Sequence, residues 1–482
     1  MFMPNHRAAA ALLLALALPC PVFAQSQAEL NDIRKQIQEV KESYERRLQA
    51  LEQRLKDAES TAANAQQQAR EAEAAAANAQ KQAAEAQTAA APQAGAQGSA
   101  SGFNPSISVV LMGTYANLSQ SPDAYGVTGF ASPGQISPGS RGFSLDESEV
   151  AFSANIDQLF YGNLLLSFNG DSVETEEAYF QTLALGYGLT LKGGRFFSGI
   201  GYQNSVHAHA WDFDDSALMQ RTFLGNNYGD VGVQATWVAP TPFFLQLGGE
   251  LGAGTSLPGN FDGDTELLEI DRNKNGIGAW TLFVKFGGDV GPSNSYQLGA
   301  SYLKSSTGPD SPTLADFDTR LPGVTTAWHG NAEIYGLDAV WKWAPNGNAT
   351  DRNFKLVAEW MQLKRDGNLA SDGPAGPQED GFDMSQYGWY VQGVYQFMPE
   401  WRIGARYDRL DWGSFSGGTN DANLSDSDYN PWRLSAMADW SPSEFSRIRL
   451  QYNYDKSQQD VTDHQIFLQY IFSLGAHGAH KF

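Results

Sequence analysis

The chain has 482 residues, with 54 acidic and 32 basic side chains, a formal net charge of −22 and a single cysteine. The acidic balance excludes a sequence-independent nucleic-acid binder, which needs a basic face, and a lone cysteine excludes a disulfide within the chain. Outside the N-terminus no run of 18 apolar residues occurs, which excludes a bundle of transmembrane helices. Two classes of protein remain: an acidic soluble protein, and a membrane β-barrel, in whose strands lipid-facing residues alternate with others.

Residues 1–24 have the composition of a secretory signal peptide. Arg7 precedes an apolar stretch over 8–18, and small or short side chains precede Gln25, so cleavage is predicted after Ala24. The alternatives are a buried helix, which the prolines that follow the apolar stretch would end, and a lipoprotein site at Cys20. Pro19 stands where such a site needs a small residue. The mature chain would contain no cysteine, which suits a periplasmic or outer-membrane address.

Residues 25–88 carry a heptad pattern. Apolar positions recur from Leu30 at alternating spacings of three and four, with one stutter between Tyr44 and Leu48, and the seam changes to alanine after Leu55. A single solvated helix or a disordered Ala/Gln-rich spacer is the alternative. We expect a periplasmic coiled coil because a lone helix this polar would bury nothing, and we expect residues 89–101 to be a flexible linker.

Residues 102–482 alternate between apolar and polar side chains in a series of short segments. In 401–408, for example, Trp401 and Ile403 share one face while Arg402 and Arg406 share the other. A soluble β-sandwich would also alternate. Aromatic residues at strand ends, frequent charges on the opposite face, and short turns that alternate with long Gly/Asp/Asn/Ser-rich loops favour a transmembrane antiparallel barrel.

The pattern predicts an all-β barrel of sixteen strands, a number that leaves an aqueous channel. The predicted strands span 106–118, 143–156, 163–169, 174–183, 189–197, 231–239, 243–253, 279–289, 294–304, 332–344, 354–365, 386–397, 401–410, 431–440, 444–455 and 464–474. Long loops are expected near 119–142, 198–230, 254–278, 305–331, 366–385 and 411–430.

This combination of a signal peptide, a heptad segment, sixteen strands and a C-terminal Phe482 resembles outer-membrane porins of the phosphate-selective porin O and P type. The resemblance implies a homotrimer with the third long loop folded into each pore. Two features differ from that family. Residues 473–482 do not alternate down to the final Phe, and most of the excess acid lies in the barrel region, whereas the family's wells are rich in Arg and Lys. We therefore do not expect phosphate selectivity.

The expected pore lining combines a basic wall and an acidic loop. The wall residues, which share the polar faces of neighbouring strands, are Arg402, Arg406, Arg433, Arg447 and Arg449. The loop residues are Asp212, Asp214 and Asp215. If the loop folds inward, acid faces base across a constriction and sets ion preference. The alternative is that the arginines pair with Asp408, Asp439 and Asp455 and only keep the wall hydrated.

Two segments are candidate metal sites. His207 and His209, with the three loop aspartates, suit Zn²⁺ or a similar ion, and His477 and His480 form a second pair; ordinary surface histidines are the alternative. Residues 271–276 match the first half of an EF-hand loop, but position twelve would be Leu282. This segment is predicted to be a turn, with weak Ca²⁺ binding as the alternative.

The sequence thus predicts a non-enzymatic outer-membrane porin of a Gram-negative bacterium, without a resident cofactor, for passive diffusion of small hydrophilic solutes or ions. Its partners would be outer-membrane lipid, two further copies of the chain and, through the coiled coil, nearby peptidoglycan. No Gly-x-Ser-x-Gly or His-Glu-x-x-His motif supports an enzyme. The alternatives are an importer for a metal ion or metal complex, for which 25–100 would be a poor plug, and a tether to the cell wall.

Overall fold

The computed structural model describes residues 105–130, 136–169, 172–254, 277–306, 324–424 and 428–475. All belong to the second of two compact units, Ala100–Phe482. The predicted signal peptide, coiled coil and linker, the EF-hand-like segment 271–276, and His477, His480 and Phe482 lie outside the described residues. Among the described residues, no helix is long and apolar enough to cross a membrane.

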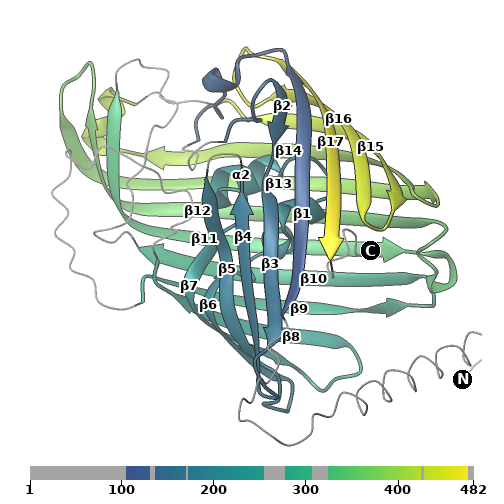
Figure 1. Ribbon diagram of the computed structural model, residues 1–482. Coiled ribbons are helices and arrows are strands. Elements are labelled where there is room, and N and C mark those ends of the chain that lie inside the picture. Colours follow the sequence, from purple (N-terminus) through teal and green to yellow (C-terminus); the bar gives the residue numbers. More distant parts are fainter. Residues whose placement is uncertain are drawn as a thin grey trace, which may run out of the picture. The chain divides into compact units, whose positions relative to one another are not determined.

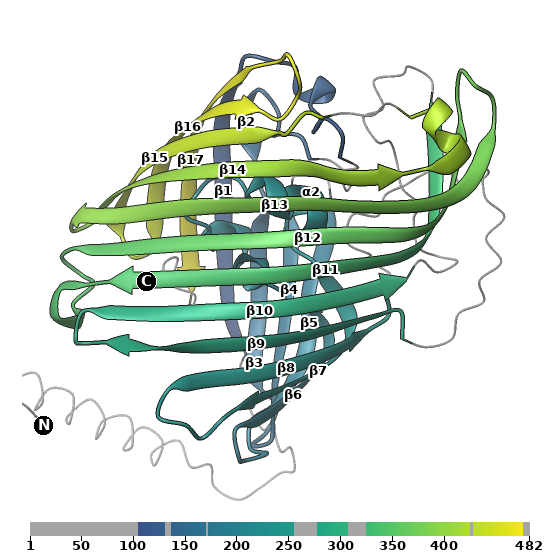
Figure 2. The same cartoon turned by 180° about the vertical axis from the view of Figure 1, so that it is seen from behind.

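The described residues form one closed antiparallel barrel (Figures 1 and 2). Its first nine strands are β1 (Ser106–Leu118), β2 (Gly142–Leu145), β3 (Ser148–Asn155), β4 (Phe160–Phe168), β5 (Val173–Thr182), β6 (Leu189–Phe197), β7 (Gly229–Val238), β8 (Phe244–Gly252) and β9 (Ala279–Val290). The others are β10 (Asn294–Ser306), β11 (Thr325–Trp343), β12 (Asn353–Asp372), β13 (Gln378–Met398), β14 (Trp401–Ser416), β15 (Trp432–Ser443), β16 (Ser446–Lys456) and β17 (Asp463–Gly475). Each strand from β3 onward pairs with the next, and β17 pairs with β1, which closes the ring.

The predicted count of sixteen is confirmed, because β2 and β3 are two parts of one wall strand. Both pair with β1, and Asp146 and Glu147 interrupt them. The Ser148 hydroxyl accepts a hydrogen bond from the Met112 backbone N–H at 3.0 Å, a place that a ladder carbonyl would otherwise take. The interruption turns the neighbouring acidic side chains toward the interior.

Strands β11 to β14 are longer than predicted. The segment 366–385, expected to be a long loop, continues β12 to Asp372 and begins β13 at Gln378, so only a short turn separates them. The Gly/Asp/Asn-rich composition of this segment disfavours strands. Continuous pairing with both neighbours outweighs that local preference, because every ladder bond satisfies a backbone donor and acceptor.

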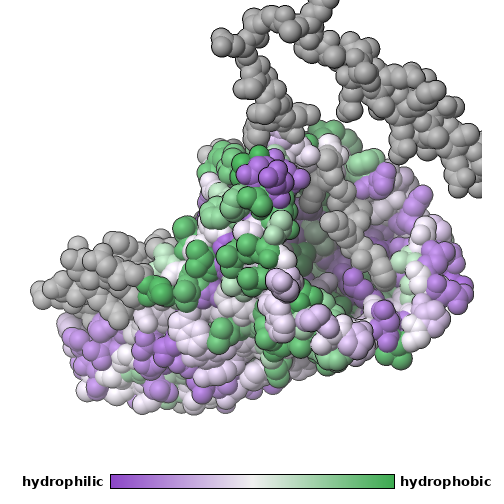
Figure 3. Space-filling model, turned by 90° about the horizontal axis from the view of Figure 1, so that it is seen from below, coloured by the Kyte–Doolittle hydropathy of each residue, from purple (hydrophilic) through white to green (hydrophobic). Residues whose placement is uncertain are grey.

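The barrel has its apolar face outside and its polar face inside. Along β14 to β17 the exposed side chains are mainly apolar, as with Ile403, Leu450 and Leu468, whereas the alternate positions are buried and polar. Figure 3, seen from below, shows several groups of green hydrophobic residues on the surface, with white and purple residues between them. A soluble domain has the opposite arrangement.

The interior is only partly polar. Two connections enter it: the β1–β2 loop, with a 3₁₀ turn η1 (Pro122–Ala124), and the β6–β7 loop, with η2 (Gln203–Ser205), η3 (Ala208–Ala210) and the helix α2 (Leu218–Leu224). Both ribbon views place α2 within the ring of strands (Figures 1 and 2). Two further 3₁₀ turns, η5 (Pro345–Gly347) and η6 (Gly418–Ala422), follow β11 and β14. The entering loops form an apolar core with inward-facing residues of β10 to β14, so the lumen is narrower than sixteen strands alone would leave.

Candidate functional site

The β6–β7 loop, residues 198–228, is held inside the barrel by buried wall carboxylates. Glu250 on β8 accepts the Gly199 backbone N–H at 2.8 Å, and Glu359 on β12 accepts the Tyr202 N–H at 2.9 Å. Asp408 on β14 accepts the Leu218 N–H at 3.0 Å, at the start of α2. Carboxylates thus satisfy loop donors that no strand partner could reach.

One side-chain amide joins the two ends of the loop, and a glycine ends its helix. The Asn204 amide donates to the carbonyls of Ser198 and Tyr228, both at 2.9 Å, and so joins the two ends of the loop. Helix α2 ends at Gly225, whose φ of 64° is the left-handed conformation that favours glycine at this position. The loop therefore has a defined path rather than a free one.

Asp215 joins the loop to the arginine wall. Its carboxylate lies 2.6 Å from the guanidinium groups of both Arg406 and Arg433. Both arginines also contact Asp408, at 3.0 and 3.3 Å. Arg406, Arg433, Asp408 and Asp215 are all buried, which makes this a desolvated network in which each charge needs its partner.

Asp212 makes a second junction. It lies 2.6 Å from the Lys355 ammonium and 3.4 Å from Arg402, whose guanidinium also binds Asp439 at 2.5 Å. Arg402 and Asp439 are directly opposite each other in the β14–β15 register. Arg402 therefore makes both contacts. It pairs with Asp439 on the neighbouring strand, as the alternative from the sequence proposed, and it also contacts Asp212 of the loop.

The last two wall arginines bind backbone carbonyls of the loop. Arg447 donates to the His209 carbonyl at 2.5 Å and Arg449 to the Trp211 carbonyl at 2.7 Å. The expectation that acid faces base across an open constriction is therefore wrong for Asp212 and Asp215. The loop lies directly on the wall because, away from bulk water, direct ion pairing is favoured over two separately solvated charges.

The three loop aspartates have different protonation properties. Burial would raise the pKa of Asp212, but Lys355 and Arg402 outweigh it and lower that pKa to about 2. Burial would also raise the pKa of Asp215, but Arg433 and Arg406 outweigh it and hold that pKa well below the usual range. Burial, with the nearby carboxylates of Asp146 and Asp215, raises the pKa of Asp214 to about 7. Asp214 thus changes charge near neutral pH.

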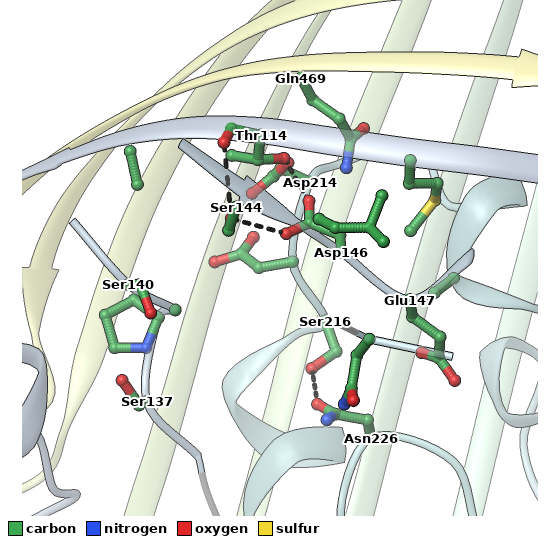
Figure 4. A pocket seen from close by; sticks show the side chains of 18 of the residues that line it. Thr114, Ser137, Ser140, Ser144, Asp146, Glu147, Asp214, Ser216, Asn226 and Gln469 are labelled. Atoms are coloured by element: carbon green, nitrogen blue, oxygen red, sulfur yellow. Dashed lines mark hydrogen bonds between the residues drawn. The ribbon is translucent and has the colours of Figure 1, made fainter. Parts of the chain in front are cut away.

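A polar cavity of 420 Å³ lies beside the loop (Figure 4). It is lined by β1, by the β2–β3 interruption, by β4 and β5, and by the loop around Asp214 and Ser216. The carboxylates that line it are Asp146, Glu147, Glu174, Asp214 and Asp215, with Arg221 as the basic residue in that lining. Asp146 accepts hydrogen bonds from the hydroxyls of Thr114 and Ser144. The open space beside the loop is therefore acidic. The five arginines of the basic wall contact the loop but do not line this cavity.

The two loop histidines face glutamates instead of the predicted aspartates. His207 Nδ1 lies 3.5 Å from Glu176 and its Nε2 lies 3.4 Å from Glu177. His209 Nδ1 lies 2.7 Å from Glu149. Burial would lower the pKa of His207, but the glutamates raise it well above its ordinary value. Of the aspartates predicted to join the histidines, Asp212 and Asp215 pair with basic side chains, and Asp214 lines the cavity.

Sequence reasoning missed these glutamates. Glu147 and Glu149 fall in the run Asp146–Glu149, and Glu176 and Glu177 fall in a predicted strand. Acidic side chains on consecutive strand positions, where alternation should place one of the two toward lipid, were the available signal.

No family model matches the sequence. An uncharacterized protein of Aquifex aeolicus (strain VF5) is 29% identical over 358 residues, which cover 71% of this chain and 70% of that protein. Similar solved structures include the outer membrane channel DcaP of Acinetobacter baumannii, at 12% identity and a TM-score of 0.46, which covers 79% of this chain and 100% of that one.

The anion-selective porin from Comamonas acidovorans is 10% identical with a TM-score of 0.44, over 77% of this chain and 99% of that one. OprB of Pseudomonas putida is 13% identical with a TM-score of 0.45, over 77% and 94%. Similarity at this level assigns neither a family nor a solute, and the resemblance to phosphate-selective porins stays a prediction.

Proposed function

We propose that the protein is an outer-membrane channel for passive diffusion of small hydrophilic solutes or ions. The observation that carries the proposal is the inverted polarity of a closed barrel. A bilayer offers no hydrogen bonds, so a spanning sheet must close on itself, and its outer face must be apolar. Both conditions hold for the described strands.

Exposed aromatic residues support a membrane position. Trp401 and Trp440, near the short turns, stack with their ring centroids 5.8 Å apart. Trp341 of β11 and Phe354 of β12 have ring centroids 5.7 Å apart. Amphipathic rings of this kind favour the level of the lipid headgroups. The short-turn end would then face the periplasm.

The acidic cavity supports a preference for cations. The lining described above carries more carboxylates than basic groups, and in a narrow, low-dielectric passage such an excess attracts cations and repels anions. Arg402, Arg406 and Arg433 add little to this field because Asp212, Asp215, Asp408 and Asp439 pair with them. Arg447 and Arg449, which bind loop carbonyls, keep their charge, but neither lines the cavity.

The test is conductance of the purified protein in planar bilayers, with the reversal potential measured across a KCl gradient. We expect discrete steps of current and a cation-selective reversal potential. A protein that inserts into the bilayer and gives no current steps would overturn the proposal. Anion selectivity would preserve the channel and overturn the role of the cavity.

A further inference from the structure

A β-bulge directs two consecutive glutamates to one histidine. In the β4–β5 register Leu165 faces Glu177 and Leu166 faces Thr175, so Glu176 is the extra residue. A bulge re-aims the side chains beside it. As a result Glu176 and Glu177 both reach the ring of His207 from the same strand, which regular alternation would forbid.

The atoms at the centre of this cluster lack hydrogen bonds. Glu176 Oε2 and His207 Nδ1 are buried and meet no hydrogen-bond geometry; the 3.5 Å between them is an ion-pair distance. Two ligands that each bind a tetrahedral Zn²⁺ at 2.0–2.2 Å lie roughly 3.4 Å apart. The observed spacing therefore fits two atoms that share an ion better than it fits a direct hydrogen bond.

A third ligand and its support come from neighbouring segments. Carboxylate oxygens of Glu149 and Glu176 and a ring nitrogen of His207 all lie within 4.8 Å of one another. His209 Nδ1, 2.7 Å from Glu149 Oε1, would orient that carboxylate from the second layer of contacts. The ligands come from β3, β5 and the β6–β7 loop, so the tertiary structure alone assembles them.

The charge of the cluster also calls for a cation. Glu147 lies beside Glu149 and Glu176, and Glu177 completes four carboxylates around two imidazoles. This mostly buried place therefore holds more acidic than basic groups, an arrangement that a bound cation would stabilise. Glu147 also lines the 420 Å³ cavity, so the cluster lies next to open space.

We propose that Glu149, Glu176 and His207 bind one divalent transition-metal ion per chain, with Zn²⁺ or Co²⁺ favoured over Mg²⁺. Imidazole nitrogen with carboxylate oxygen suits the former ions, whereas Mg²⁺ prefers oxygen ligands alone. The proposal concerns equilibrium binding inside the barrel and does not depend on conductance, so it can stand or fall separately from the channel.

The test is a titration of the full-length, untagged protein in detergent at about pH 8, where protons compete less with the metal than at neutral pH. His477→Ala and His480→Ala form the background, so that the second histidine pair contributes nothing. Zn²⁺ is followed by calorimetry and Co²⁺ by its visible absorption. We expect one ion per chain, and an affinity at least tenfold lower in separate Glu176→Gln and His207→Gln variants.

His464→Gln is the matched control, because His464 lies on the exposed side of β17 against Tyr452. It should bind Zn²⁺ like the background protein. Circular dichroism of each variant checks that the barrel is folded, and a Zn²⁺-dependent rise in the melting temperature of the background protein gives a second reading. Absent binding, or equal binding in all variants, would overturn the proposal. Absent binding would mean that protons, and not a metal ion, neutralise the carboxylates.

Discussion

Asp214 and Asp215 are adjacent in the sequence and have opposite electrostatic roles. Asp215 is ionised because Arg406 and Arg433 bind it directly, each at 2.6 Å. Asp214 lines the acidic cavity and forms no ion pair with the described residues; its backbone N–H donates to Gln451 at 2.7 Å. At the scale of single residues, one carboxylate fixes the loop while the other is free to change the charge of the cavity.

We predict that cation selectivity rises with pH through about 7 because of Asp214. Its raised pKa means that the carboxyl is protonated and neutral at lower pH and ionised above the pKa. Reversal potentials recorded between about pH 5.5 and 8.5 should show this step. Asp214→Asn should weaken it, and Asp123→Asn, a change in the exposed part of the β1–β2 loop, should leave it in place. The same step in both variants would refute the assignment.

Asp215→Asn should destabilise the loop and the barrel. It leaves buried Arg406 and Arg433 with Asp408 as their one remaining shared carboxylate among the described residues, and breaking a buried ion pair costs on the order of 3–5 kcal/mol. We expect a lower melting temperature by circular dichroism and larger fluctuations of the open-channel current. Asp351→Asn is the control, since Asp351 and Arg352 form an exposed pair. Equal melting temperatures for the two variants would contradict this role.

At the scale of elements, α2 and the β1–β2 loop depend on each other. The seven residues of α2 are all buried, and a helix this short is not stable alone. Phe223 of α2 lies 6.3 Å from Phe130 of the β1–β2 loop, measured between ring centroids, within the apolar core that also includes Trp328 of β11. The two loops thus form one packed insert against the wall of β10 to β14.

Removing an aromatic ring from this insert should widen the passage. Phe223→Ala deletes a fully buried side chain, a loss that typically costs about 3–5 kcal/mol in a packed core. We expect a higher single-channel conductance with more frequent substates. Phe143→Ala, which removes a ring that is 89% exposed on the outer face, should leave conductance unchanged. If both variants conduct like the parent, the insert does not limit the passage.

At the scale of the whole molecule, the predicted assembly is a heat-sensitive homotrimer. The heptad seam of 25–88 needs partner helices, and a barrel with a broad apolar wall can contact further copies. Chemical cross-linking of the intact protein in detergent should show three chains. Deleting 26–90 should weaken the trimer without abolishing it. A monomer at micromolar concentration would contradict the prediction.

The sequence by itself determined the sixteen strands and their polar and apolar faces, because alternation of side chains is a local property of an extended chain. It placed most strand ends within a few residues, but it missed the extensions of β11 to β14, where cross-strand pairing outweighs a Gly- and Asp-rich composition.

Only the tertiary structure decided which charged residues meet. Arg433 and Asp215 are 218 positions apart, and His207 meets Glu176 and Glu177 only because a bulge shifts one residue of β5. Such contacts depend on register, on the path of a loop through the interior and on the burial that follows. Local composition contains none of these, so the sequence located the acidic loop and the arginines but assigned the wrong carboxylates to the histidines.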